Sequence, residues 1–330
     1  MVGRCYGHAF AAQGMALCGI WDAQPSDDLQ AFAQQHGALQ HAAAGDWLGA
    51  ADVVISAVFG SAALDVATAA LPHLRAGALY IDMTTADPDD MRRAQALASQ
   101  AGHHFVDVAI TGAVNLHGAK TPLLCAGEQA PQVAELFRTL GAPIQVVGTQ
   151  PGDAASLKLL RSIFTKGLEA LSVECLLTAE RQGLRAQLHD ILGDIDQTSL
   201  KLLMESMVQT HIEHAARRQK EVAEAQRQMQ QVGIRPLVLP AVEALFQRTA
   251  ERQAHIADLA DAEQIGAAHI AEGHDARQRE PRGHVVVHTH HVGAQTDVER
   301  RLIGNRAGAI EGVEIRICHC CPSLQGGLIS

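Results

Sequence analysis

The stretch DVVISAVF (residues 52–59) decides the fold of this chain, because it is an almost continuous apolar run. A strand with one wet face would alternate apolar and polar residues, whereas a run of this kind is typical of a parallel strand covered on both faces. Helices must then lie on both faces of the sheet. The stretch therefore predicts an α/β fold.

The segments around this strand alternate between strand and helix patterns. Ser26 is placed to cap a helix over residues 26–37, and Asp87 followed by Pro88 is a typical helix start. Further strands are predicted at residues 16–22, 78–84, 103–110, 122–127 and 143–148. This alternation predicts a doubly wound Rossmann-type domain over residues 1–150.

After Pro151 the pattern becomes helical throughout. One helix is predicted over residues 153–182, which would span about 45 Å. More helices are predicted at residues 185–195, 197–232 (broken once) and 239–253. We therefore expect an all-helical substrate and dimerisation domain over residues 151–253, joined to the first domain by the long helix.

Residues 254–330 differ from the rest of the chain in composition. The last aromatic residue is Phe246, and aromatic side chains supply much of the buried area of a core. We expect this tail to be poorly ordered. CHCC (318–321) and HVVVHTHH (284–291) contain metal-ligand residue types, but the paired C-x-x-C spacing of structural zinc sites is missing, so no metal site is predicted.

Charge and composition exclude several classes of protein. A formal net charge of −10 argues against a general nucleic-acid or membrane-surface binder. The charge-free apolar stretch between Asp52 and Asp65 has 12 residues, which is too short to span a bilayer. Cys5, Cys18, Cys125 and Cys175 are scattered in apolar runs and are interpreted as reduced core thiols. These features favour a soluble, cytoplasmic protein.

The start of the chain contains elements of a dinucleotide-binding unit. VGRCYGHAFAAQGM (2–15) is similar to a glycine-rich turn and helix, with Gly3 and Gly7 as candidate phosphate contacts. Asp22 follows the next strand, where an acid binds the ribose hydroxyls and favours NAD over NADP. The G-x-G-x-x-G spacing is not met, however. Only Met1 and Val2 precede the turn, so the first strand is expected to be missing, unless another segment substitutes for it.

Three segments together carry a resemblance to a known family. VDVAITGAVNLHGAKTPLLCAG (106–127) resembles a substrate-binding stretch, GDAASLKLL (152–160) a catalytic helix start, and AARRQKEVAEA (215–225) a C-terminal-domain segment. Over residues 3–253 the chain resembles the β-hydroxyacid dehydrogenase superfamily, which includes 3-hydroxyisobutyrate and 6-phosphogluconate dehydrogenases. The wording of 157–177 looks closest to its branch of 6-phosphogluconate-dehydrogenase-like NAD-binding proteins.

The resemblance implies roles for particular residues. Lys158 stands in the place of the catalytic lysine, and Thr111, Gly112 and Ala113 stand in the substrate loop. Ser162 replaces the family's usual Asn, and Ala113 replaces a Gly, so the residues expected to contact the substrate differ from the family pattern at these two positions. Cofactor contacts are further expected at the strand ends, at Val58, Phe59 and Thr84.

Helical spacing places polar residues on one face of the predicted long helix. Lys158, Ser162, Thr165 and Lys166 would form a stripe, with Arg161 at its edge. Lysine is a suitable acid/base when burial and neighbouring cations lower its pKa. We expect this stripe to line a cleft between the two domains, where Lys166 or Arg161 could bind a carboxylate or could simply pair with an acid such as Glu169.

The leading hypothesis is an NAD(P)-dependent oxidoreductase that transfers a hydride between a nicotinamide cofactor and a small hydroxy acid. A homodimer is expected, because the long helix exposes more apolar surface than one small bundle covers. The alternative is a catalytically inactive or truncated Rossmann-type fragment that acts as a binding or scaffold protein. An imine reductase is a third alternative, but those proteins typically replace the lysine.

Overall fold

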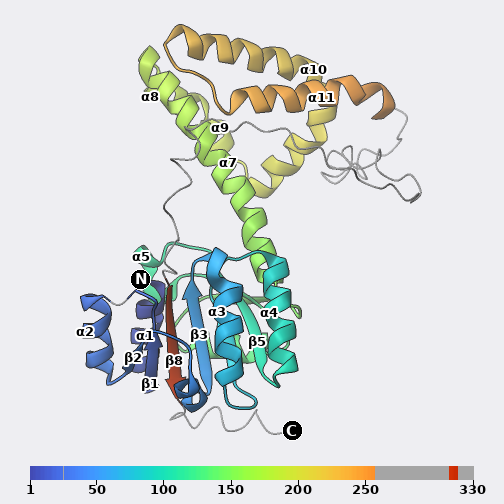
Figure 1. Cartoon of the computed structure of the whole chain (residues 1–330). Helices are drawn as coiled ribbons and strands as arrows, with labels where there is room; N and C mark the ends of the chain where they lie inside the picture. The colour runs from blue at the N-terminus through green and yellow to red at the C-terminus, as the bar shows by residue number, and fades with distance from the viewer. Residues whose placement is uncertain (25, 257–311, 319–330) are drawn as a thin grey trace, which may run out of the picture. The chain divides into compact units, whose positions relative to one another are not determined.

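The computed structural model describes residues 1–24, 26–256 and 312–318, with side chains described up to residue 252 (Figure 1). These residues belong to two compact units. The first contains residues 1–163 and the strand at 312–318, and the second begins at Phe164. The predicted boundary was residue 150. It moves because the start of the long helix packs on the sheet, where Ala154 and Ala155 are fully buried.

The first unit is built on an eight-stranded sheet with the order β2-β1-β8-β3-β4-β5-β6-β7. β3, β4 and β5 are parallel neighbours, whereas β6 runs antiparallel to β5. The strands are β1 (Ala16–Trp21), β2 (Leu39–His41), β3 (Val53–Val58), β4 (Leu79–Asp82), β5 (His104–Ile110), β6 (Leu123–Ala126), β7 (Ile144–Gly148) and β8 (Gly312–Cys318).

Helices begin where the sequence supplies caps. The Ser26 side chain accepts a hydrogen bond from the Leu29 N–H at 3.2 Å, and the Asp87 side chain accepts one from the Asp89 N–H at 2.8 Å, as predicted. The helices of the first unit are α1 (Val2–Ala12), α2 (Asp27–His36), α3 (Ala63–Ala70), α4 (Pro88–Gln100), α5 (Val114–His117) and α6 (Ala130–Arg138). Short 3₁₀ helices lie at Asp46–Ala50, Gly60–Ala62, Leu71–His73 and Gly118–Lys120.

Apolar layers cover both faces of this sheet. On one face Tyr6 of α1 packs edge-on against Phe137 of α6, with ring centroids 5.5 Å apart. On the other face Tyr80 and Phe105 stack across β4 and β5, and Met91 of α4 packs with them. α3 and α4 lie over β3 to β5 in Figure 1. The predicted doubly wound α/β domain is confirmed.

β8 occupies the position between β1 and β3 where a strand was expected to be missing. It pairs antiparallel with both neighbours, so the facing backbone groups of β1 and β3 have partners (Figure 1). This strand lies inside the tail that was expected to be poorly ordered. The expectation is therefore wrong for residues 312–318, whereas residues 257–311 and 319–330 lie outside the described residues.

The second unit is helical, as predicted. Its long helix α7 (Asp153–Gln182) begins in the first unit and has the predicted bounds, and α10 is continuous rather than broken. α10 and α11 pack along each other (Figure 1). The buried carboxylate of Glu174 accepts hydrogen bonds from the Val238 N–H at 2.7 Å and the Leu239 N–H at 3.3 Å, at the start of α11. The remaining helices are α8 (Arg185–Ile191), α9 (Gly193–Asp196), α10 (Leu200–Gln231) and α11 (Leu239–Ile256).

The structure differs from the sequence interpretation at two of the cysteines. Cys5, Cys125 and Cys175 are free thiols, but Cys175 is exposed and Cys18 is disulfide-bonded, so the prediction of four reduced core thiols is wrong for these two. The residues of CHCC and HVVVHTHH lie outside the described residues, apart from Cys318 at the end of β8. Within the described ranges, no helix is long and apolar enough to cross a membrane.

Candidate active site

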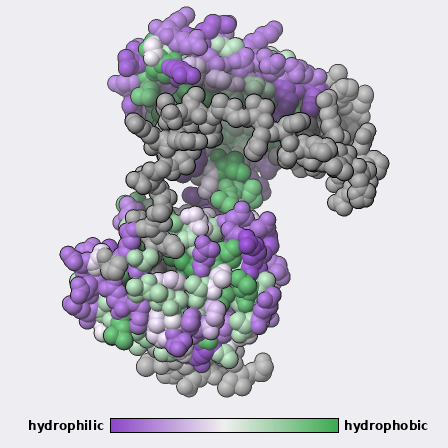
Figure 2. Space-filling view, viewed as in Figure 1, coloured by the Kyte–Doolittle hydropathy of each residue, from purple (hydrophilic) through white to green (hydrophobic). Residues whose placement is uncertain are grey.

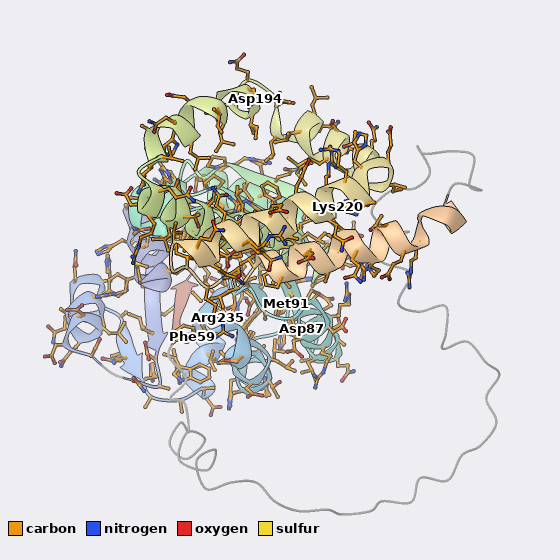
Figure 3. All side chains as sticks on the ribbon, turned by 90° about the horizontal axis from the view of Figure 1, so that it is seen from above. Phe59, Asp87, Met91, Asp194, Lys220 and Arg235 are labelled. Carbon is orange, nitrogen blue, oxygen red and sulfur yellow. The ribbon has the colours of Figure 1, made fainter. Side chains whose placement is uncertain are left out.

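The carboxyl ends of β3 and β4 bring two predicted cofactor residues together. The Val58 N–H donates a hydrogen bond to the Thr84 hydroxyl at 3.3 Å. A Cβ at Gly60 would lie 2.6 Å from the Thr85 carbonyl oxygen, so the loops after the two strands touch. Phe59 projects here with 56% of its surface exposed (Figure 3). In open α/β sheets, ligands bind at this edge.

The glycines predicted to contact phosphates do not lie in a turn, whereas the predicted ribose contact, Asp22, lies directly after a strand. Gly3 and Gly7 lie within α1, on the buried side that also carries Tyr6 and Phe10, so the prediction of a glycine turn there is wrong. The physical reason is the three- and four-residue spacing of these positions, which is that of a helix face. Asp22 directly follows β1, and its Oδ1 accepts a hydrogen bond from the Gln24 N–H at 2.8 Å.

The predicted substrate loop follows β5 and is held firmly. The Thr111 hydroxyl donates to the Pro122 carbonyl at 3.0 Å, and the Thr111 N–H donates to the same oxygen at 2.9 Å. A Cβ at Gly112 would lie 2.9 Å from the Thr121 methyl carbon, so glycine allows this close approach. Ala113 precedes α5 without a side-chain cap. Because the Thr111 hydroxyl already donates its proton to the Pro122 carbonyl, it can act toward a ligand only as an acceptor.

Lys158 lies in the second turn of α7 and is half-buried. Burial lowers the pKa of its ammonium and the nearby Arg161 guanidinium lowers it further, whereas the Asp107 carboxylate opposes this fall in pKa. An amine in such surroundings gives up its proton more easily than a lysine in water. This is the property required of a lysine that acts as a general acid/base.

Two further residues of the predicted polar stripe are engaged within the helix. The Ser162 hydroxyl donates to the Lys158 backbone carbonyl at 3.0 Å, which is a common bond for a helical serine. The Lys166 ammonium pairs with the Glu169 carboxylate at 2.7 Å, and both side chains are largely exposed in the second unit. The alternative interpretation of Lys166, as the partner of a nearby acid, is the one that the structure shows.

Sequence reasoning missed a row of buried polar residues across β3, β4 and β5. Ser56 is the register partner of Asp82, and Asp82 is the register partner of Asp107, so the three side chains share one sheet face. All three residues are fully buried. Asp82 Oδ1 accepts from the Thr84 N–H at 2.7 Å, and Asp107 Oδ2 accepts from the Gly152 N–H at 2.9 Å. The row thus touches the loop after β4 and the start of α7.

Both carboxyl groups of this row have raised pKa values. Burial raises the pKa of Asp82 to about 7, against a hydrogen bond from Thr84, and the charge of Asp107 adds to the rise. Burial also raises the pKa of Asp107 to about 6, against hydrogen bonds from the start of α7. One signal in the sequence could have found them, since each acid interrupts an otherwise apolar strand.

Comparison with known proteins agrees with this geometry. A family model described as the NAD-binding domain of 6-phosphogluconate dehydrogenase matches residues 3–148. A second model, described as a domain of unknown function (DUF1932), matches residues 179–256. The first match covers β1 to β7 with their helices and leaves out β8, and the second covers most of the described part of the helical unit.

One similar protein comes from Methanothermus fervidus and is described as an uncharacterized 28.5 kDa protein in the 7S RNA 5′ region. It is 30% identical over 200 residues, which are 61% of this chain and 76% of that protein. A solved structure of a conserved hypothetical protein from Sinorhizobium meliloti is 28% identical, with a TM-score of 0.51, over 82% of this chain and 91% of that one.

Two further solved structures connect the fold to enzymes. A conserved protein of unknown function, described as structurally similar to 3-hydroxyacid dehydrogenases, is 28% identical with a TM-score of 0.51 over 76% of this chain and 94% of that one. A reductive aminase from Aspergillus terreus, solved with NADPH and ethyl levulinate, shares the fold at 18% identity and a TM-score of 0.61, over 76% of this chain and 90% of that one. The chain therefore belongs to the family built on the NAD-binding domain of 6-phosphogluconate dehydrogenase.

Proposed function

We propose that this protein is an NAD(P)-dependent oxidoreductase that transfers a hydride between the nicotinamide ring and a small hydroxy acid. Lys158 is the general acid/base. The observation that carries the proposal is the half-buried ammonium of Lys158, whose pKa is lowered by burial and by Arg161. It stands on the helix that directly follows an NAD-binding domain. Proton transfer by the lysine and hydride transfer by the cofactor together complete the oxidation of an alcohol.

In this proposal, particular residues transfer the proton and bind the substrate. Lys158 Nζ takes the proton of the substrate hydroxyl and returns it in the reverse reaction. Backbone N–H groups of the Gly112–Ala113 loop bind the substrate carboxylate. Ser162 contributes as an acceptor, because its proton is already donated to a backbone carbonyl.

The cofactor fits the carboxyl edge of the sheet. The touching loops after β3 and β4 offer Val58 and Thr84, and the exposed ring of Phe59 offers an apolar contact for a planar base. The Asp22 carboxylate accepts hydrogen bonds from the ribose hydroxyls and repels a 2′-phosphate by its charge, which favours NAD over NADP.

The experiment that tests this function follows the hydride itself. A panel of short hydroxy acids, deuterated at the carbinol carbon, is incubated with the protein and NAD⁺ or NADP⁺. Mass spectrometry then measures deuterium in the reduced nicotinamide. We expect deuterium transfer from at least one acid, faster with NAD⁺. If no acid transfers deuterium to either cofactor, the proposed function is wrong.

A second candidate is a binding or scaffold protein without turnover. It is favoured by the position of Gly3 and Gly7 within α1, which leaves no glycine turn there for phosphates. Titration of Trp21 fluorescence separates the two candidates, because Trp21 precedes the ribose-binding candidate Asp22. Saturable quenching by NADH supports the enzyme, and no response to NADH or NADPH supports the scaffold. For imine reduction, the comparisons support only a shared fold.

The partner that we propose is a second copy of this chain. Leu168, Leu171, Val173 and Leu177 of α7 are exposed in the second unit, as are apolar residues of α10 such as Leu202. Figure 2 shows apolar side chains gathered along α7. In a twofold dimer the matching residues of the second copy can cover these exposed side chains, because such an interface is self-complementary.

A further inference from the structure

The carboxylate of Asp107 connects the sheet to the start of α7. Its Oδ2 accepts hydrogen bonds from the backbone N–H groups of Gly152 at 2.9 Å and Ala155 at 3.0 Å. The first N–H groups of a helix have no partner within the helix, so an acceptor at this place fixes where the helix begins. Lys158 follows Ala155 by three residues, about one turn. Whatever fixes this turn therefore also fixes the position of Lys158.

Asp82 makes the charge of Asp107 possible. Neighbouring buried carboxyl groups resist being ionised together, so one of them keeps a proton. Asp107 receives hydrogen bonds from the start of α7, whereas Asp82 Oδ1 receives one from the Thr84 N–H at 2.7 Å. The charge is therefore better stabilised on Asp107. The pKa values agree, since burial raises that of Asp82 to about 7 and that of Asp107 to about 6.

A proton on Asp82 also explains two polar atoms in this row. Asp82 Oδ2 and Asp107 Oδ1 are buried without a hydrogen-bond partner. Carboxylate oxygens can only accept, so two ionised groups could not satisfy each other. A protonated Asp82 is a donor, and its register neighbour Asp107 can accept that proton.

We propose that Asp107 is a positioning residue for Lys158, with Asp82 as its protonated partner in the sheet. This role rests on the proposed function, in which Lys158 carries the proton. Asp107 acts in two ways. Its hydrogen bonds hold the first turn of α7, and its negative charge favours the protonated form of Lys158.

Other ionisable groups also surround Asp107. Asp153 on α7 raises the pKa of Asp107 by its charge, and Asp107 in turn raises that of Cys125 on β6. Arg161 lowers the pKa of Lys158. These groups are unchanged in the variants below, so a change in Lys158 reports on the carboxyl pair.

Asp107→Asn and Asp82→Asn form a matched pair of variants for the test. Asn at position 82 keeps an acceptor for the Thr84 N–H and a donor toward Asp107, as the protonated acid does. Asn at position 107 loses the charge, so its amide oxygen accepts from the Gly152 and Ala155 N–H groups more weakly than the carboxylate oxygen does. The first measurement is the labelling rate of the Lys158 amine by trace acetic anhydride near neutral pH, with Lys201 as internal reference. The second is amide hydrogen exchange of residues 149–158. Neither needs a cofactor or turnover.

The expected results distinguish the two acids. In Asp107→Asn, acetic anhydride is expected to label Lys158 about threefold faster. Loss of a nearby negative charge lowers the pKa of the ammonium, so more of the reactive neutral amine is present. Residues 149–158 exchange faster, whereas Asp82→Asn leaves both measurements as in the unchanged protein. The proposal is overturned if the Lys158 labelling rate and the amide exchange of residues 149–158 are the same in Asp107→Asn as in the unchanged protein. It is also overturned if Asp82→Asn changes both measurements as much as Asp107→Asn does. A missing hydride transfer would contradict the proposed function but leave these two measurements intact.

A further measurement covers the case in which Asp107→Asn does not fold. Infrared spectra of the unchanged protein near pH 7, above the pKa of Asp107, are expected to contain the carbonyl band of a buried protonated carboxyl group. Asp82→Asn should remove that band. If the band persists in Asp82→Asn, the proton is not on Asp82 and the proposal is wrong.

Discussion

At the residue scale, the buried acids Asp82 and Asp107 make the stability of the first unit depend on pH. Each takes up a proton in the folded chain at a pH where an exposed carboxyl group has already lost it. Between about pH 4 and pH 7 the folded state therefore binds more protons than the unfolded state. Under that condition the free energy of unfolding falls as pH rises.

Asp82→Asn is expected to remove part of this dependence. Because its pKa in the folded protein is about 7, ionisation of Asp82 lowers the free energy of unfolding by on the order of 2–4 kcal/mol above neutral pH, relative to acid conditions. The variant should therefore be increasingly more stable than the unchanged protein as pH rises from 5 to 8. Urea unfolding followed by tryptophan fluorescence measures this, because Trp21 and Trp47 both lie in the first unit. Asp89→Asn, at an exposed acid on α4, is the control. Parallel stability curves for Asp82→Asn and the unchanged protein would show that Asp82 does not titrate in this way.

At the element scale, the sequence predicted the strands and helices whose signals are local. The apolar run of β3, the caps Ser26 and Asp87, and the bounds of α7 all depend on residues close in the chain. β8 could not be predicted, because its place depends on pairing with β1 and β3 almost three hundred and about two hundred and sixty residues away. The site was predicted less completely. Lys158 was found by resemblance, whereas Asp82 and Asp107 become neighbours only through strand register.

The start of α7 gives a prediction at this scale. Gly152 has φ of +97°, and a Cβ there would lie 2.6 Å from the Pro88 carbonyl oxygen. Gly152→Ala should therefore destabilise the fold by about 1–3 kcal/mol through backbone strain and the clash. Gly167→Ala, within α7, is the matched control, because a Cβ there meets nothing within 4 Å. It should stabilise by about 0.5–1 kcal/mol. Urea unfolding followed by circular dichroism measures both, and equal midpoints for the two variants would contradict the role of Gly152.

At the scale of the whole molecule, the exposed apolar residues of the helical unit predict self-association. Sedimentation of the unchanged protein should give twice the mass of one chain. Val173→Glu with Leu177→Glu places two charges on the exposed face of α7 and should return the protein to single chains. Leu97→Glu, at an exposed leucine of α4, should leave the mass unchanged. A single-chain mass for the unchanged protein, or a dimer that survives the double variant, would contradict the proposed interface.

The most direct test of the account is turnover by Lys158→Ala, measured beside Lys201→Ala, whose lysine is exposed on α10. We expect Lys158→Ala to quench with NADH as the unchanged protein does, and to lose at least about 100-fold in kcat with the best hydroxy acid. Lys201→Ala should keep full activity. Equal kcat in Lys158→Ala and the unchanged protein would remove this ammonium from the chemistry and contradict the central claim.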